Sequence, residues 1–190
     1  TTTISSTGTL NIDSTSSHDL QKRAIVNEGT VNWTGGSIRG GNGSTITNAS
    51  GGTFNDLHTG NLTFSNTFGG SYIFTNNGTY IRNQTGTTFF DAIFNNNSAL
   101  NLQQGDVQIR AGGTISSTGS MTAASGTNIW FTNGYILQSG AMLLGDGLYK
   151  LTGGTFTLGG DLDATTFTQT SGTFTGTGTI KKTYNWDSGN

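Results

Sequence analysis

Two aspartates close together in the chain, Asp161 and Asp163, have the spacing that best fits acid–base chemistry. Residues two apart on a β-strand point to the same side, with Cα atoms about 7 Å apart. Glycoside hydrolysis uses two carboxylates about 5–9.5 Å apart, and Asp146 would lie nearby on an adjacent turn of the chain. The alternative is that all three are solvated or turn residues, since Gly145-Asp146-Gly147 is typical of a turn. We favour the alternative and assign no catalytic residue.

The two histidines, His18 and His58, are the only imidazole metal ligands, and they lie 40 residues apart. A metal site needs three or four ligands, and only Asp19 and Asp56 are close to them in sequence. The segment Gly40-Gly41-Asn42-Gly43-Ser44 approaches a calcium-binding repeat but lacks its aspartate. We therefore interpret both histidines as loop residues and assign no metal and no cofactor.

Threonine-rich and aromatic residues suggest two binding functions. Thr155-Phe156-Thr157 and Thr173-Phe174-Thr175 are similar to the Thr-x-Thr rows of ice-binding solenoids. Here the middle residue is Phe and the rows do not recur on every coil, and Thr is also common on strand surfaces. Ice binding is therefore a minor alternative. A carbohydrate platform would draw on five aromatic residues: Trp33, Trp130, Trp186, Tyr135 and Tyr149. We expect Trp33 and Trp186 in the core and leave Trp130 open.

A short repeated pattern in the sequence predicts the strands on or between which all of these residues lie. A small residue, a spacer, an apolar residue, a polar residue and a second mostly apolar residue recur nine times, at intervals of about 21 residues. The first apolar position is always filled, by Leu10, Val31, Phe54, Tyr80, Leu100, Met121, Met142, Leu162 and Tyr184. The second position fails at Asp56 and Arg82, beside the longest intervals. We therefore expect irregular or loop-bearing coils near residues 56–90.

Alternation with a period of two indicates β-strands, and Gly-Gly, Asn-Gly and Ser-Gly pairs mark corners between them. No segment carries a helical pattern. A strand that returns every 21 residues predicts an all-β solenoid of about nine coils, each with two or three strands. Stacked coils would also align Asn11, Asn32, Asn55, Asn101 and Asn185 into amide ladders. A propeller is disfavoured, because its blades need about 40–50 residues each.

Composition agrees with a narrow, repeated core. Only 31% of the residues are hydrophobic and 9% are charged, with 31 Gly and no Pro or Cys. The low charge and the aromatic content argue against disorder. The net charge of −2, without a basic run, disfavours nucleic-acid binding. No apolar stretch approaches the length of a membrane-spanning helix.

The two ends of the chain match complementary parts of one unit. Asn185-Trp186 at the end repeats Asn32-Trp33, and Thr9-Leu10-Asn11 at the start repeats Thr53-Phe54-Asn55. We therefore expect residues 1–190 to form a single solenoid segment of a longer repeat array.

The chain resembles the repetitive regions of filamentous-haemagglutinin-like adhesins and autotransporter passenger domains of bacteria. The segments NEGTVNWTGGSIRG, NASGGTFN, LTGGTFTLGG and SGTFTGTGTI carry the resemblance. It implies a right-handed single-stranded parallel β-helix, export, and a cell-surface or extracellular-matrix location. The expected function is a structural or adhesive rod or filament rather than an enzyme. Expected partners are further copies stacked end to end, and a surface glycan or a host or matrix receptor. The alternative is a carbohydrate-binding or polysaccharide-cleaving β-helix.

Overall fold

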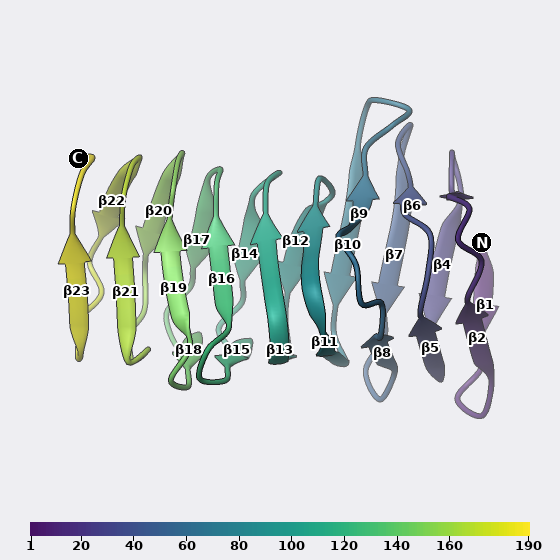
Figure 1. Ribbon diagram of the computed structural model, residues 1–190, viewed down its shortest axis with the longest axis horizontal. Coiled ribbons are helices and arrows are strands. Elements are labelled where there is room, and N and C mark those ends of the chain that lie inside the picture. Colours follow the sequence, from purple (N-terminus) through teal and green to yellow (C-terminus); the bar gives the residue numbers. More distant parts are fainter.

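The computed structural model describes residues 1–190, which wind into a parallel β-solenoid of about nine turns spaced about 21 residues apart. It contains 23 strands and no helix. Figure 1 shows the strands side by side along the long axis, with the two termini at opposite ends. All strand pairings are parallel, so the predicted all-β solenoid is confirmed.

The first face of the solenoid is a nine-stranded sheet that takes one strand from every coil. Neighbouring strands in it come from successive coils, so its order follows the order of the chain. Its strands are β1 (Thr2–Ile4), β4 (Ala24–Asn27), β7 (Ser44–Asn48), β10 (Tyr72–Asn76), β12 (Ile93–Asn96), β14 (Gly113–Ile115), β17 (Tyr135–Leu137), β20 (Thr155–Leu158) and β22 (Thr173–Gly176).

The other two faces share one sheet, because two long strands, β11 (Thr79–Phe90) and β13 (Ala99–Ile109), run from the second face into the third. The second face also holds β2 (Thr9–Ile12), β5 (Thr30–Trp33), β8 (Thr53–Asp56), β15 (Ser120–Ala123) and β18 (Met142–Leu144). The third face also holds β3 (His18–Asp19), β6 (Ile38–Arg39), β9 (Leu62–Ser65), β16 (Asn128–Phe131), β19 (Leu148–Leu151), β21 (Thr166–Gln169) and β23 (Thr183–Trp186).

The core consists of columns of inward side chains that repeat from coil to coil. On the second face, strand register aligns the predicted column from Leu10 to Met121. Aromatic neighbours stack within it, as for Phe54 and Tyr80, whose ring centroids are 5.3 Å apart. Such columns bury large apolar surfaces with few residues per coil, which explains how a 31% hydrophobic chain forms a core.

The predicted column is wrong at two places. Met142 points outward and is 46% exposed, and Leu143 takes the inward place opposite Met121. Met142, Leu143 and Leu144 are all apolar, so alternation alone leaves the phase of this strand undetermined.

The second error lies in the last coil. Tyr184 pairs with Phe167 on the third face rather than continuing the second-face column, and Trp186 is 64% exposed rather than in the core. All three strands of a coil share the same alternation, so the pattern does not say to which face a strand belongs.

Asparagine ladders run along the axis at two places. The predicted ladder forms on the outside for its first three members, with Asn32 donating to Asn11 at 3.0 Å and Asn55 donating to Asn32 at 2.9 Å. Ile81 then interrupts it before Asn101.

A second ladder, not predicted, lies buried at the corner between the first and second faces. Each of the first three side-chain amides donates to the next at 2.8 Å, along the series Asn27, Asn48, Asn76 and Asn96. Buried amides need such partners, so this ladder links four coils through their side chains.

The one interruption of strand register falls within residues 56–90. The pairing of β11 with β13 shifts between Arg82 and Thr87. The first face runs past the same coils without a shift. The irregularity therefore lies where the second face passes into the third, and the first face stays continuous.

Candidate functional site

Asp161 and Asp163 lie on the outside of the solenoid, on either side of the buried Leu162. Both carboxylates line the largest hollow in the structure, of about 450 Å³, over the last three coils. The rest of its wall comes from glycine and small polar residues together with Ala141, Met142 and Lys181. The sequence therefore identified two residues that share one hollow.

Each carboxylate is held in an ion pair. Lys181 Nζ lies 2.7 Å from Asp161 Oδ2, and Lys182 Nζ lies 3.2 Å from Asp163 Oδ1. The hydrogen bond from Lys181 lowers the pKa of the Asp161 carboxyl. A general acid needs a raised pKa, so the electrostatics of this hollow favour binding of a polar molecule over proton donation.

Asp146 does not join this pair at the hollow. Its carboxylate accepts a hydrogen bond from Thr165 Oγ1 at 2.9 Å, and it is absent from the lining of the hollow. The flanking Gly145 has a φ of 90°, as expected of a tight turn.

The two histidines lie in different surroundings. His18 is on β3 in the first coil, where its Nε2 lies 3.3 Å from the carbonyl oxygens of Ser14 and Gly35. The neighbouring Asp19 forms a two-point ion pair with Arg39, at 2.6 and 2.8 Å. No group of three His, Cys, Asp or Glu side chains converges in the structure.

His58 lies in the loop between β8 and β9, as expected, but its side chain is buried beside Trp33, with ring centroids 4.6 Å apart. It belongs to a cluster of five polar side chains inside the core, called here the core polar cluster: Asp56, His58, Tyr80, Arg82 and Thr88. All five are almost completely shielded from solvent. The cluster lies where the second face passes into the third.

Asp56 is the centre of the core polar cluster. Its Oδ1 lies 2.7 Å from Arg82 Nη1 and 3.1 Å from His58 Nε2, and its Oδ2 accepts from Tyr80 at 2.7 Å and from Thr88. Burial and the charge of Asp56 raise the pKa of Tyr80, so its hydroxyl keeps the proton that it donates. The arrangement compensates a buried carboxylate with one cation and two hydroxyls.

Burial lowers the pKa of His58; the charge of Asp56 acts in the opposite direction, and that of Arg82 lowers it further. Nδ1 of His58 and Nε of Arg82 lack hydrogen-bond partners. The cluster is closed to solvent and none of its members lines a hollow. We therefore interpret it as an internal ionic contact between two coils.

The aromatic residues do not form the platform that the sequence allowed. Trp33 is buried as expected and donates to the carbonyl oxygen of Gly36 at 2.7 Å. Tyr135 and Tyr149 are also buried. Trp130 points outward from the third face and is half-buried, with Lys150 Nζ 5.8 Å from its ring centroid.

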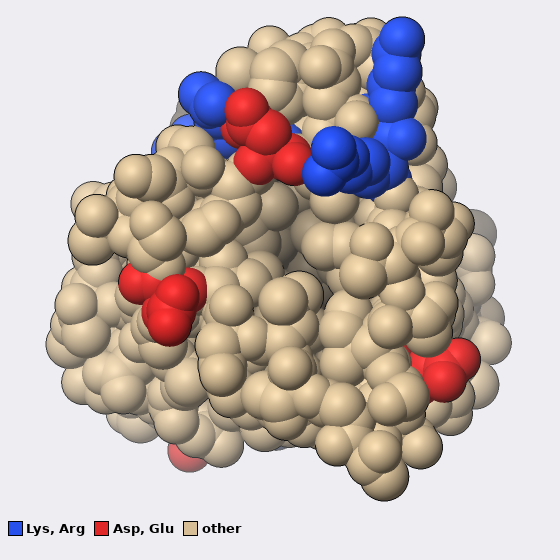
Figure 2. Space-filling view, turned by 90° about the vertical axis from the view of Figure 1, so that its right-hand side faces the viewer, with Lys and Arg blue, Asp and Glu red and all other residues tan.

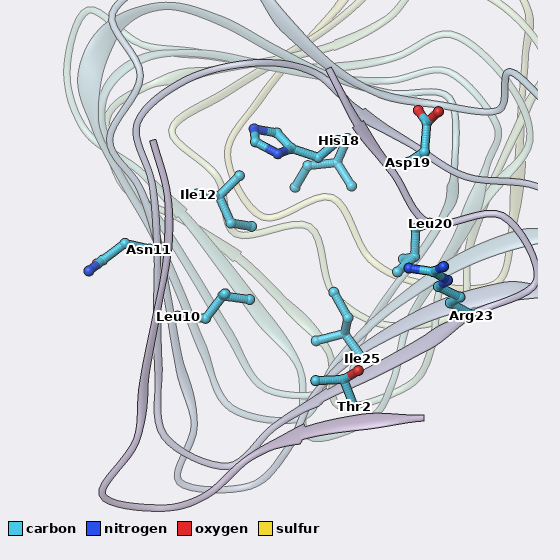
Figure 3. A pocket seen from close by; sticks show the side chains of 10 residues that line it. Thr2, Leu10, Asn11, Ile12, His18, Asp19, Leu20, Arg23 and Ile25 are labelled. Atoms are coloured by element: carbon cyan, nitrogen blue, oxygen red, sulfur yellow. The ribbon is translucent and has the colours of Figure 1, made fainter. Parts of the chain in front are cut away.

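Both ends of the solenoid expose the core. Figure 2 looks onto the N-terminal end and shows a central hollow with basic side chains gathered along one part of its rim. The hollow is about 280 Å³, and apolar side chains such as Leu10, Ile12 and Ile25 point into it (Figure 3). At the other end, a hollow of about 220 Å³ is lined by Phe174, Tyr184 and Trp186 with two polar residues.

Comparison of the chain with protein-family models, with curated proteins and with solved structures finds no match. The fold rests on the strand pairing itself. The resemblance to adhesin and passenger-domain repeats stays a prediction. None of the elements in the structure is a helix with the length and apolar character of a membrane span.

Proposed function

We propose that this chain is a stiff structural segment of a secreted bacterial protein, at the cell surface or in the extracellular matrix. The observation that carries the proposal is the first face, whose nine strands pair from the first coil to the last without a register shift. Paired parallel strands lie about 4.8 Å apart, so the stack is a rod about 40 Å long.

The rod resists stretching because its backbone hydrogen bonds run along the axis on three sides. To separate two coils, the strand pairs on all three faces must be broken at the same time. The buried asparagine ladder adds side-chain bonds across the first half of the stack, from Asn27 to Asn96. Interlocked core columns resist bending as well, since close-packed interiors are hardly compressible.

The distribution of hollows also fits a structural segment. Two of the three hollows lie at the ends of the stack, and the third lies over its last coils. None of the three hollows lies over the middle of the rod. We therefore assign the chain a mechanical role, in which it spaces or displays other parts of an assembly.

We further propose that the two ends associate with each other in separate copies. Each end presents unpaired strand edges, which are ready templates for another strand. Each also presents apolar side chains around a hollow, at Leu10 and Ile25 on one end and at Phe174 and Tyr184 on the other. Head-to-tail contact of different surfaces produces open filaments.

Electron microscopy of the chain at rising concentration tests both parts of the proposal. We expect rigid rods about 40 Å long at low concentration, because nine coils repeat at about 4.8 Å. At high concentration we expect lengths that are multiples of this unit. Bent or collapsed particles would contradict the rod, whereas short rods at every concentration would contradict only the end-to-end contact.

The hollow beside Asp161 and Asp163 favours a second candidate, carbohydrate binding or cleavage, because carboxylates and small polar groups line it. A glycan array and a reducing-sugar assay test this candidate. Binding or cleavage that is lost in Asp161→Asn and Asp163→Asn would support it. Thr122→Asn, on the same face but outside the hollow, is the matched control. No signal in either assay would leave the structural role alone.

A further inference from the structure

The first face carries no charge in any of its nine strands. None of β1, β4, β7, β10, β12, β14, β17, β20 and β22 contains Asp, Glu, Lys or Arg. The strands of the other sheet do contain charged residues, among them Asp19, Asp106 and Lys150. The first face is therefore a distinct surface, which spans the whole length of the rod.

Strand register places one outward residue of each coil in a single line along this face, called here the threonine column. Eight of its nine members are β-branched and six are threonine: Thr3, Val26, Thr47, Thr75, Asn95, Thr114, Ile136, Thr157 and Thr175. Asn95, the exception, accepts a hydrogen bond from Thr114 at 3.2 Å. Almost every coil thus presents a γ-methyl group at the same place.

A second line runs beside the threonine column, two residues earlier in each strand. It aligns Ala24, Thr45, Ile73 and Ile93 in the first half of the rod, and Thr155 with Thr173 in the last two coils. Its members are again threonine or aliphatic. Ile93 is 36% exposed, and Ile136 in the threonine column is 44% exposed, so large aliphatic groups are displayed here.

The phenylalanines in the Thr-Phe-Thr segments do not interrupt this surface. Phe156 is buried in the core, as is Phe74 at the equivalent place on β10, because the middle residue of each triplet points inward. Thr45-Ile46-Thr47 on β7 forms a third such row, and in other coils alanine, valine, isoleucine or asparagine stands where a threonine would be.

The geometry of the two lines is regular and rigid. Neighbouring coils lie about 4.8 Å apart, and residues two apart on a strand lie about 6.6 Å apart. β-Branched side chains have few χ1 rotamers, so their methyl and hydroxyl groups form a fixed two-dimensional array. The coil spacing is close to one of the oxygen repeats on the surface of hexagonal ice.

We propose that the first face binds ice. Methyl groups at lattice spacing hold water in an ordered layer, and threonine hydroxyls anchor that layer to the protein by hydrogen bonds. Charged groups would instead organise their own hydration shells, and this face has none. This binding function goes beyond the structural role and does not depend on it.

The other faces lack these properties. On the second face the outward lines contain the Asn11 to Asn55 ladder, whose amides bond to each other, and then the charged Asp161 and Asp163. On the third face the corresponding line holds Phe89, Gln108, Trp130 and Lys150, which are bulky and uneven in shape. The first face alone is uncharged in all nine coils and carries a β-branched residue at the same place in eight of them.

Thermal hysteresis and inhibition of ice recrystallisation, measured on the 190-residue chain, test the proposal. We expect the wild-type chain to hold the freezing point below the melting point. Thr75→Tyr, in the middle of the threonine column, should reduce the hysteresis by more than half, because a phenol ring lifts the face from the lattice. Tyr is a good strand residue, and circular dichroism would verify folding.

Thr122→Tyr is the matched control, since Thr122 is a half-buried outward residue in the middle of the second face. It should retain wild-type hysteresis. Absence of hysteresis and of recrystallisation inhibition in the wild type would overturn the proposal, as would equal losses in both variants. Binding to crystalline chitin or cellulose without any effect on ice would assign the face to a polysaccharide surface and overturn the ice assignment as well. Rod dimensions in the electron microscope would be unchanged in every case.

Discussion

The core polar cluster makes a sharp prediction about stability, through the substitution Arg82→Met. Arg82 is fully buried, and its guanidinium lies 2.7 Å from Asp56 while donating to the carbonyl oxygen of Thr85 at 2.8 Å. Removing one partner of a buried ion pair leaves an uncompensated charge and costs about 3–5 kcal/mol. Methionine fills much of the same space, so the loss reports mainly on the charge.

A second substitution separates charge from packing. In the double variant Asp56→Asn with Arg82→Met, no charge remains in the core. The amide oxygen of the asparagine still accepts from Tyr80 and Thr88. We therefore expect the double variant to recover at least half of the free energy of unfolding that Arg82→Met loses. Neighbouring residues in a network show coupling of about 0.5–3 kcal/mol.

Denaturant unfolding followed by far-ultraviolet circular dichroism measures these free energies. Thermal melting should show the loss as a shift of roughly 2–4 °C per kcal/mol for a chain of this length. Hydrogen exchange should show the opening concentrated in β8 and β11. The control is Arg39→Met, which removes the exposed Asp19–Arg39 pair, with side chains 48% and 38% accessible. That pair is exposed and screened by solvent, so its loss should change the free energy of unfolding far less than the loss of the buried pair.

Two results would refute this account of the cluster. The first is a loss below about 1 kcal/mol in Arg82→Met, which would mean that the buried carboxylate needs no cation. The second is a double variant less stable than the single one, which would mean that packing by the arginine, and not its charge, stabilises these coils.

Three further predictions concern pH, the ladder and the turns. Burial lowers the pKa of His58 in the folded chain, so the unfolded chain binds this proton first as the pH falls below about 6.5, and the free energy of unfolding should decrease there. His58→Gln should flatten this part of a plot of unfolding midpoint against pH, and an unchanged slope would contradict the assignment to His58. Asn76→Ala removes two donated hydrogen bonds and leaves their buried acceptors without a partner, so it should lower the free energy of unfolding in denaturant by about 2–4 kcal/mol. No measurable loss would show that the ladder adds no stability. Gly105→Ala should lower the melting temperature more than Gly126→Ala. Both glycines have a positive φ, but a Cβ at Gly105 would lie 2.4 Å from the Gln84 carbonyl oxygen, whereas a Cβ at Gly126 would meet nothing within 4 Å. Equal melting temperatures would contradict this steric explanation.

The regular parts of the fold were predictable because each coil repeats one local pattern. The column from Leu10 to Met121 follows directly from alternation at intervals of about 21 residues. The phase at Met142 was not predictable, because three consecutive apolar residues fit either side of a strand. Nor was the face of Tyr184, because the three strands of a coil share their alternation.

The polar features inside the core show a different limit. The failures of the apolar pattern at Asp56 and Arg82 were visible in the sequence and carried opposite charges, which was the available signal. Their pairing depends on two coils stacking in register, 26 residues apart, and local pattern does not report that. The same holds for the ladder from Asn27 to Asn96, whose members each precede a glycine or serine by two residues.

By itself the sequence determined that the chain forms strands, that they repeat at about 21 residues, and that the core is a set of narrow columns. These properties depend on alternation and on turn residues, which act over a few positions of the chain. Only the tertiary structure decided which outward residues share a face. Each coil contributes one residue to the threonine column, and it is the pairing of successive strands that makes a continuous surface of them.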